Sequence, residues 1–194
     1  MKYSKEVFAR YGKKYIRVYQ AYNSEIANEA VKLQNFGKNF STQRMTWIKP
    51  SFLWLMNRSN WGTKKNQENI LAVDVYRDFF DGLLEKAVLT FPDSELFSGK
   101  EWEKKFSESD VYCQWDPDRG INGNPIGRYA VQIGIKGNAL RDFLERGIFS
   151  IEDITPLVRK WNIQRKNNKL NIKDLPSERI YPVDSRIIRK KLDM

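Results

Sequence analysis

One stretch, residues 45–62, concentrates the residue types that bind anionic, aromatic ligands. It holds three of the six tryptophans and two cations, namely Trp47, Trp54, Trp61, Lys49 and Arg58. An indole ring stacks on other rings, and an ammonium or guanidinium group pairs with phosphate. The stretch is therefore the first candidate for binding an anionic cofactor, with Trp47 or Trp54 stacking on a ring of that ligand.

A helix start within this stretch would strengthen such a site. Pro50 suits a first helical position, Ser51 follows it, and Gly62 can end the helix. Lys49 would then lie at a helix N-terminus, where free backbone N–H groups and the helix dipole favour an anion. Thr46 and Ser51 would add hydroxyl groups. Spacing alone leaves the alternative open, a core helix with its tryptophans inside and Lys49 in solvent.

The absence of histidine restricts the chemistry of any active site. With no histidine and a single cysteine, Cys113, the chain has no Ser-His-Asp triad, no Cys-His nucleophile and no His-ligated zinc. Catalysis is left to carboxylates, lysine, tyrosine, serine or threonine, backbone donors or a bound cofactor. One cysteine also makes no internal disulfide, which suits a reducing, cytoplasmic setting.

A second polar pair falls on a predicted strand, residues 128–135. Arg128 and Gln132 share one face of this strand with Ala130, because side chains alternate, and the other face is apolar. Two interpretations are open. The polar face is either open to water or forms a polar floor that recognises a phosphate or a base edge.

The net charge favours polyanionic partners. Lys and Arg number 34 against 24 Asp and Glu, a formal charge of +10, and nucleic acid is the commonest partner of such chains. Residues 162–194 form a basic C-terminal extension, and Trp161 and Tyr181, interleaved with these cations, would stack on bases. The alternative is a solvated basic terminus that packs through Trp161 and Ile180. No apolar run is long enough for a transmembrane helix, so we expect no membrane partner.

The pattern along the chain predicts a single α+β domain over residues 1–194, with a mixed, mainly antiparallel sheet and short helices. Alternation of apolar and polar residues or apolar runs predict strands at 15–22, 70–76, 111–115 and 128–135. Helical spacing predicts helices at 25–33, 77–87, 138–146 and 151–161. Residues 1–14 read as a loosely held start, and residues 90–110 as a surface insertion.

The carboxylates between 116 and 122 resemble the opening of a calcium loop, Asp-x-Asp-x-Gly-x-Asn. Gly127 stands where such a loop needs its bidentate glutamate, so a plain turn is the better interpretation. A divalent metal held by Asp74, Asp116 or Asp118 remains as a hypothesis for a nuclease or phosphoryl-transfer enzyme.

Several longer segments resemble a family known only as a domain of unknown function, number 4291. They include Val18-Tyr-Gln-Ala-Tyr22, Arg44-Met-Thr-Trp-Ile-Lys-Pro-Ser51, Gln114-Trp-Asp-Pro-Asp-Arg119 and Leu175-Pro-Ser-Glu-Arg-Ile-Tyr-Pro182. The resemblance runs from about Ile16 to Val183. It implies a single domain and brings no activity with it.

The order of elements is also similar, at fold level, to the ADP-ribosyltransferase superfamily. This analogy implies that Arg17 lies on the first strand of the site and that Thr46 and Ser51 supply its hydroxyls. Lys49, Arg17 and Arg128 would hold the phosphates of NAD, Arg58 is a further binding residue, and Gln132 stands where an acid is expected. Glu68 would then be the catalytic carboxylate. The Ser-Thr-Ser motif of that superfamily is absent.

Three hypotheses for function follow. The first is a nucleotide-dependent enzyme that transfers ADP-ribose from NAD to nucleic acid or another acceptor. The second is a non-catalytic module that binds RNA or DNA through the basic extension. The third is the metal-dependent nuclease or phosphoryl-transfer enzyme.

Overall fold

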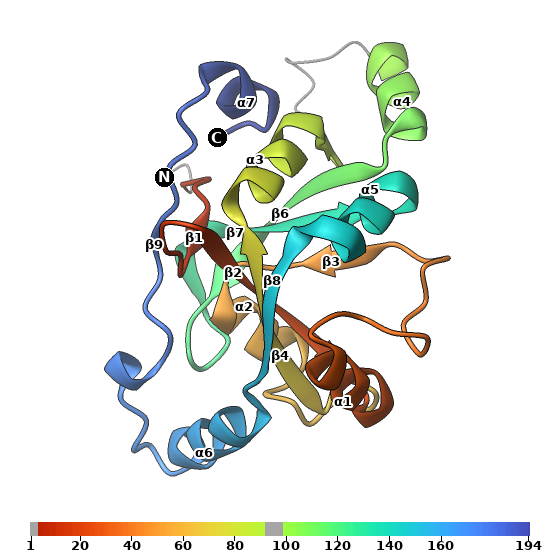
Figure 1. Cartoon of the computed structure of the whole chain (residues 1–194). Coiled ribbons are helices and arrows are strands. Elements are labelled where there is room, and N and C mark those ends of the chain that lie inside the picture. The colour runs from red at the N-terminus through yellow and green to blue at the C-terminus, as the bar shows by residue number, and fades with distance from the viewer. Residues whose placement is uncertain (1–3, 92–98) are drawn as a thin grey trace.

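The computed structural model of the chain describes residues 4–91 and 99–194. Its strands form two sheets and a short ribbon (Figure 1). The first sheet, β2-β4-β8, is antiparallel and consists of β2 (Tyr15–Tyr22), β4 (Asn69–Tyr76) and β8 (Ile148–Asp153). The second, β3-β7-β6-β5, consists of β3 (Thr46–Ile48), β7 (Pro125–Ile135), β6 (Val111–Arg119) and β5 (Val88–Leu89), and its β5–β6 pair is parallel. The predicted α+β class with mainly antiparallel pairing is confirmed.

The helices lie around these sheets and at their ends (Figure 1). They are α1 (Ser24–Leu33), α2 (Phe52–Arg58), α3 (Arg77–Lys86), α4 (Gly99–Glu108), α5 (Gly137–Asp142), α6 (Thr155–Lys166) and α7 (Arg186–Lys191). A π-helical turn (Phe143–Gly147) continues α5, and a 3-10 turn (Ile172–Asp174) follows α6. No helix within the described ranges is both long and apolar enough to cross a membrane.

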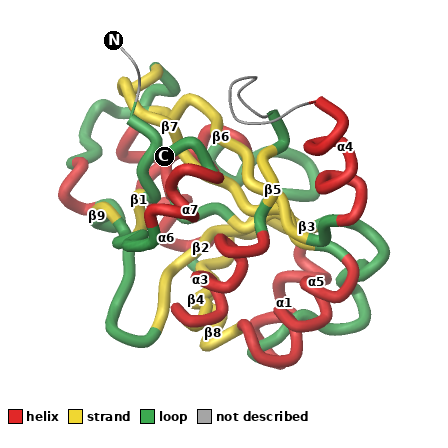
Figure 2. Tube along the Cα trace, turned by 90° about the horizontal axis from the view of Figure 1, so that it is seen from above, coloured by secondary structure: helices red, strands yellow, loops and turns green. Residues whose placement is uncertain are grey.

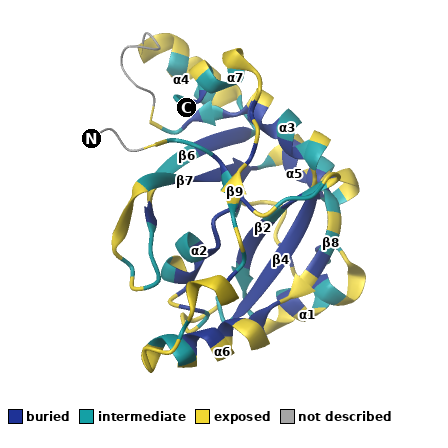
Figure 3. Cartoon of the chain, turned by 90° about the vertical axis from the view of Figure 1, so that its left-hand side faces the viewer, coloured by how far each residue is buried: buried dark blue, intermediate teal, exposed yellow. Residues whose placement is uncertain are grey.

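Strand β4 is buried on both faces, which explains its continuous apolar sequence. Leu71, Val73 and Val75 join a core cluster that includes side chains of α1 and α3. Ile70 and Ala72 point the other way, into a second cluster with side chains of α2 and α6. Figure 3 shows β2 and β4 as buried strands in the middle of the molecule. Within the described residues, two buried clusters therefore pack against the first sheet, one on each face.

The N-terminal residues from Ser4 onward are held more firmly than predicted. Strand β1 (Phe8–Ala9) pairs with β9 (Arg179–Ile180), and Val7 and Ala9 are fully buried. Figure 2 shows this ribbon and α7 on the same side of the molecule. Ion pairs add to this association: Glu6 binds Arg189 and Lys5 binds Asp193. A few buried apolar residues therefore hold each of the two polar terminal segments against the rest of the protein.

Five short strands, β1, β3, β5, β8 and β9, are not among the strands predicted from the sequence, and β3 and β8 are the longest of them. The periodicity predicts no strand at β3, which lies just before the helix of the central stretch, and it predicts a helix from residue 151, whereas β8 runs to Asp153 and α6 begins at Thr155. Each strand depends on a partner far along the chain, because β3 pairs with β7 and β8 pairs with β4. Three to six residues carry too little periodicity to reveal such pairing.

Residues 90–110 were predicted to be a surface insertion. The described part of that segment contains α4, none of whose residues is buried, and Trp102 of this helix donates to the Leu89 carbonyl. Figure 3 shows α4 at the edge of the molecule. Residues 92–98 lie outside the described residues.

Candidate functional site

Helix α2 begins at Phe52, two residues later than predicted, because Ser51 is its N-cap and Pro50 precedes the cap. The first helical N–H, that of Phe52, donates to Glu178 Oε1 at 2.6 Å. The Ser51 hydroxyl donates to Asp118 Oδ1 at 3.0 Å. A carboxyl group of the chain itself, that of Glu178, therefore occupies the position at which a bound anion was expected.

Ser51, Asp118, Arg128 and Glu178 form one group, which we call the Asp118 cluster. Arg128 Nε donates to Asp118 Oδ2 at 2.7 Å, and its Nη2 lies 3.5 Å from Glu178 Oε2. The Asp118 side chain is 0% exposed and that of Glu178 is 10% exposed. Burial raises the pKa of Glu178 to about 8, against the opposing effects of the Phe52 N–H and Arg128. Ser51 and Arg128 are thus bound to partners within the chain.

A cavity of about 390 Å³ is lined by residues of β2, of β3 and of the loop before β3. A bridge between Tyr19 of β2 and Lys49, the residue after β3, joins the two strands. We call this cavity the β2–β3 pocket. Its polar lining comprises Gln20, Tyr22, Asn23, Ser41, Arg44, Thr46, Lys49, Asn66 and Gln67, and Trp47 adds an indole. Thr46, Trp47 and Lys49 are residues that the sequence analysis assigned to a binding site.

Gln20 gives this pocket an unsatisfied acceptor. Its amide nitrogen donates to Thr46 Oγ1 at 3.0 Å and to the Trp47 carbonyl at 3.3 Å, and the Tyr22 hydroxyl lies 3.2 Å from Thr46 Oγ1. Gln20 is 2% exposed, and its Oε1 has no hydrogen-bond partner. A buried carbonyl oxygen without a donor costs about 1–3 kcal/mol. A ligand hydroxyl or amide would relieve that cost.

Lys49 supplies a positively charged group whose pKa is unusually low for a lysine. Its ammonium donates to the Trp47 carbonyl at 2.8 Å and lies 5.9 Å from the centre of the Trp54 ring. Burial lowers the pKa of Lys49 to about 7, and Arg58 lowers it further while Asp116 opposes the change. Lys49 therefore changes charge near neutral pH, and an anion beside it would favour the charged form.

A second hollow of about 280 Å³ is lined by Trp54, whose ring centre is the one 5.9 Å from the Lys49 ammonium, and by Arg58, Asp116 and Arg119, among others. Gln132, predicted to lie on a polar strand face, does so and donates to the carboxylate of Asp116. The predicted binding residues are therefore divided among three places in the structure. One group lines the β2–β3 pocket, another surrounds this hollow, and Ser51 with Arg128 belongs to the Asp118 cluster.

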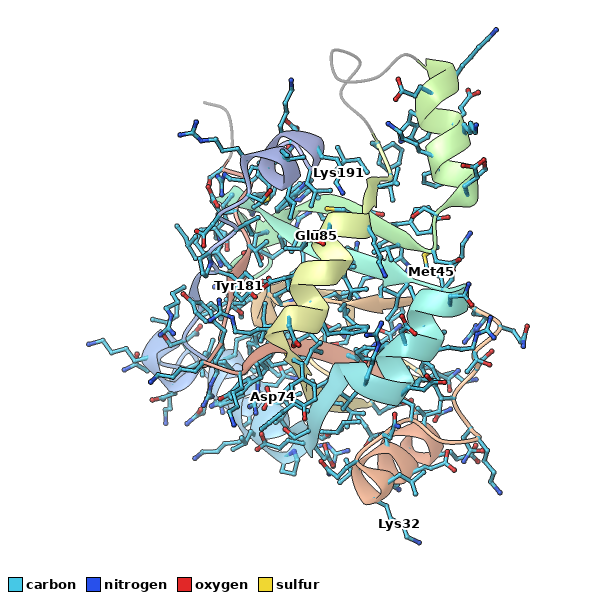
Figure 4. The ribbon with its side chains drawn as sticks, turned by 45° about the horizontal axis from the view of Figure 1, so that its top comes forward. Lys32, Met45, Asp74, Glu85, Tyr181 and Lys191 are labelled. Carbon is cyan, nitrogen blue, oxygen red and sulfur yellow. The ribbon has the colours of Figure 1, made fainter. Side chains whose placement is uncertain are left out.

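The two predicted catalytic residues lie outside the β2–β3 pocket lining. Arg17 points from the opposite face of β2 and binds Asp74 through two hydrogen bonds of 2.8 and 2.9 Å. In Figure 4, Asp74 is well separated from Met45, which lines the pocket. Glu68 follows the lining residue Gln67, but its Oε1 accepts the Asn66 N–H at 2.8 Å. The contacts that the structure shows for Arg17 and Glu68 do not direct either side chain into the β2–β3 pocket.

Sequence reasoning missed Gln20, Tyr22 and Arg44 as pocket residues. A signal was present for Gln20, because it shares a strand face with the apolar Ile16 and Val18. A polar side chain on an otherwise apolar face needs partners, so it marks either a buried network or a site. Arg44 carried no comparable signal, since its loop has no periodicity.

The carboxylates considered for a metal do not gather into a site. Asp74 binds Arg17, and Asp118 is enclosed by Ser51 and Arg128. Across residues 4–91 and 99–194, no group of three or more His, Cys, Asp or Glu side chains is placed to hold a metal ion.

The family model described as a domain of unknown function, DUF4291, matches residues 6–181. The chain belongs to the DUF4291 family. The match includes the β2–β3 pocket, the hollow around Asp116 and the Asp118 cluster, and it ends before α7. No curated protein matches the chain. Membership in DUF4291 agrees with the resemblance seen in the sequence, and function must be argued from the site.

Proposed function

We propose that this DUF4291 protein binds a phosphorylated nucleotide in the β2–β3 pocket. NAD is the leading ligand, and transfer of ADP-ribose to nucleic acid or another acceptor is the leading reaction. One observation carries the proposal. A lysine of lowered pKa, Lys49, and the unpartnered buried carbonyl of Gln20 line the same pocket.

The pocket offers each contact that a nucleotide needs. Lys49 and the exposed Arg44 supply positive charge for phosphate oxygens. Trp47 and Tyr22 supply aromatic surface for a base or a nicotinamide ring. Gln20 Oε1 would accept a ribose hydroxyl. The cavity volume of about 390 Å³ lies within the range of small-molecule pockets, roughly 300–1,000 Å³.

The choice of NAD and of ADP-ribosyl transfer rests on the order of elements noted in the sequence. A first strand that lines the site, β2, is followed by a hydroxyl-bearing strand, β3, and by a buried apolar strand, β4. We further propose a cytoplasmic location, because Cys113 is a free, buried thiol.

Lys49→Met is expected to weaken NAD binding. A hydrogen bond to a charged group contributes about 1.5–3 kcal/mol, so the dissociation constant should rise about tenfold or more. Tryptophan fluorescence provides the measurement, because Trp47 lines the pocket and Trp54 lies beside Lys49. Lys32→Met is the matched control, since Lys32 is exposed at the end of α1 and points away from the molecule in Figure 4. Equal affinity of Lys49→Met and wild type would refute the role of this ammonium.

The affinity for NAD is also expected to rise as the pH falls from 8 to 6. With a pKa of about 7, Lys49 is mostly neutral at pH 8 and mostly charged at pH 6. Only the charged form attracts a phosphate. The same titration on Lys49→Met isolates the effect of the Lys49 charge. An affinity independent of pH in wild type, or the same dependence in Lys49→Met, would contradict this account.

The second candidate function, nucleic-acid binding, is favoured by a different cavity. Arg10, Tyr11, Tyr15 and Arg179 line a hollow of about 560 Å³ between the N-terminal segment, α6 and the C-terminal segment. The aromatic residues proposed from the sequence are unsuitable, because Tyr181 is 0% exposed and Trp161 is 9% exposed in the core. Tyr11 and Tyr15 are the better stacking residues.

If this hollow binds single-stranded RNA, affinity is expected to fall about tenfold between roughly 50 and 200 mM salt, since a few phosphates are neutralised. Arg179→Ala should reduce both the affinity and the salt dependence, whereas Lys32→Met should change neither. Fluorescence anisotropy of a labelled oligonucleotide measures both quantities. A salt-independent affinity would exclude this mode of binding.

A further inference from the structure

Asp116 is held in a fixed orientation on β6. Its Oδ1 accepts the Gln114 side-chain amide at 3.0 Å, and its Oδ2 accepts the amide of Gln132 on β7. The register pairs Gln114 with Gln132 directly across the two strands. Two neutral donors therefore orient a carboxylate that stays partly accessible, and neither donor neutralises its charge.

This carboxylate lies on the same sheet face as Trp47. Trp47 pairs with Gly134, and Gln132 is the next residue of β7 on that face. A Cβ atom at position 134 would come within 3.0 Å of the Trp47 ring and 2.7 Å of Met45 Sδ. Glycine at this position lets the indole lie close against the sheet. One face thus carries the ring of the β2–β3 pocket and the amides that hold Asp116.

Lys49 lies near both the β2–β3 pocket and the hollow that Asp116 lines. It lines the first and lies near Trp54, which lines the second. The charges of Arg58 and Asp116 both act on its ammonium. A ligand with two rings and two phosphates would extend from Trp47 past Lys49 towards Arg58 and Arg119.

We infer that Asp116 is the catalytic carboxylate of this protein, placed to act on a ligand that spans both cavities. The inference rests on the proposed binding of NAD. In the reaction, the bond between the ribose C1′ and the nicotinamide nitrogen breaks, and its electron pair leaves with neutral nicotinamide. A bond forms between C1′ and an acceptor oxygen, whose proton passes to Asp116 and then to solvent. The carboxylate charge also stabilises the oxocarbenium-like transition state.

Asp116 fits this role better than Glu68. The Glu68 carboxylate is bound to the Asn66 backbone N–H within its own loop. Asp116 has its two amide partners on one sheet face and two arginines among the residues of its hollow. General-acid or general-base groups of this type contribute roughly 10²–10⁴-fold to a rate.

The test measures NAD affinity and nicotinamide release separately on the full chain. Release is followed with water alone and with a short single-stranded RNA as the acceptor. Asp116→Asn should keep the NAD dissociation constant within about threefold and lower the release rate at least about 100-fold. Asp184→Asn, a change at an exposed aspartate of the C-terminal segment, is the matched control and should release nicotinamide at the wild-type rate. Thermal unfolding checks that each variant is folded.

Gln132→Leu provides a readout that a purely structural role would not give. Losing one amide donor leaves the Asp116 carboxylate less firmly oriented, so the release rate should fall while the NAD dissociation constant stays near the wild-type value. An unchanged release rate in Gln132→Leu would contradict this positioning role.

The possible failures are distinguishable. Wild type that does not bind NAD overturns the proposed function and this inference together. Wild type that binds NAD but releases no nicotinamide with either acceptor overturns the inference and leaves the binding site. Release at the wild-type rate by Asp116→Asn, or loss of release in Glu68→Gln alone, overturns the assignment of Asp116 and leaves the proposed function.

Discussion

Asp118→Ala is expected to lower the free energy of unfolding by about 3–5 kcal/mol, because it removes one partner of a buried ion pair. The Asp118 carboxylate is 0% exposed and accepts hydrogen bonds from Arg128, Ser51 and the Arg119 backbone. Its loss leaves Arg128 with only the longer contact to Glu178. It also places the Ser51 hydroxyl and the buried Glu178 carboxyl in a changed electrostatic environment.

Urea unfolding followed by tryptophan fluorescence measures this change, since Trp61 and Trp161 are buried in the adjoining core. Asp142→Ala is the matched control. Asp142 also binds an arginine, Arg146, but on an exposed helical surface, where ion pairs contribute little. We expect no measurable loss from that substitution. Equal stability of Asp118→Ala and Asp142→Ala would show that the Asp118 cluster does not hold the fold together.

Glu178 is expected to make stability depend on pH in a direction unusual for a carboxylate. Its pKa is about 8 in the folded chain against a reference value of 4.5. Between these values the folded state keeps a proton that the unfolded state releases. Stability should therefore fall as the pH rises from about 4.5 to 8, and stay level above that range. The total change is on the order of a few kcal/mol.

Glu178→Gln isolates this effect. Glutamine keeps an oxygen that accepts the Phe52 N–H but carries no charge at any pH. The difference in unfolding free energy between the two proteins should favour the glutamine variant increasingly from pH 5.5 to 8.5. Thermal or urea unfolding at several pH values provides the curve. A constant difference across that range would mean that Glu178 is already ionised near pH 5.

Both predictions concern contacts that join distant parts of the chain. The Asp118 cluster links α2, the hairpin of β6 and β7, and the segment that carries Glu178. The last segment precedes β9, so its attachment also positions the ribbon with β1. A loss of this cluster should release the C-terminal segment before the central sheet, because β4 is buried independently between two cores.

The long elements could be predicted from sequence, because their pattern is local. The β2 strand, the β4 strand, α1 and α3 lie within a residue or two of their predicted positions. Alternation in β2 and helical spacing in α1 report which side faces the core whatever the partner is. The α+β class followed from these elements.

The sequence also indicated which residue types in the central stretch, residues 45–62, could bind a ligand, but it did not indicate which residues of the chain they contact. Lys49, Arg58, Trp47 and Trp54 do line cavities, whereas Trp61 is buried in the core. The helix N-terminus does bind a carboxyl group, but that group is the side chain of Glu178. Ser51 and Asp118 are 67 positions apart, and Phe52 and Glu178 are 126 apart. Local patterns do not specify such pairs.

By itself, then, the sequence determined the class of fold, the buried strands and the residue types available for catalysis, including the absence of histidine. Only the tertiary structure decided which of those residues meet. It bound Ser51 and Arg128 to internal carboxylates, turned Arg17 towards Asp74, and brought Gln132 to Asp116. The physical reason is that a polar side chain loses its bound water on burial and is then held in place by the partner that replaces that water. In this chain those partners come from strands and segments far apart in the sequence.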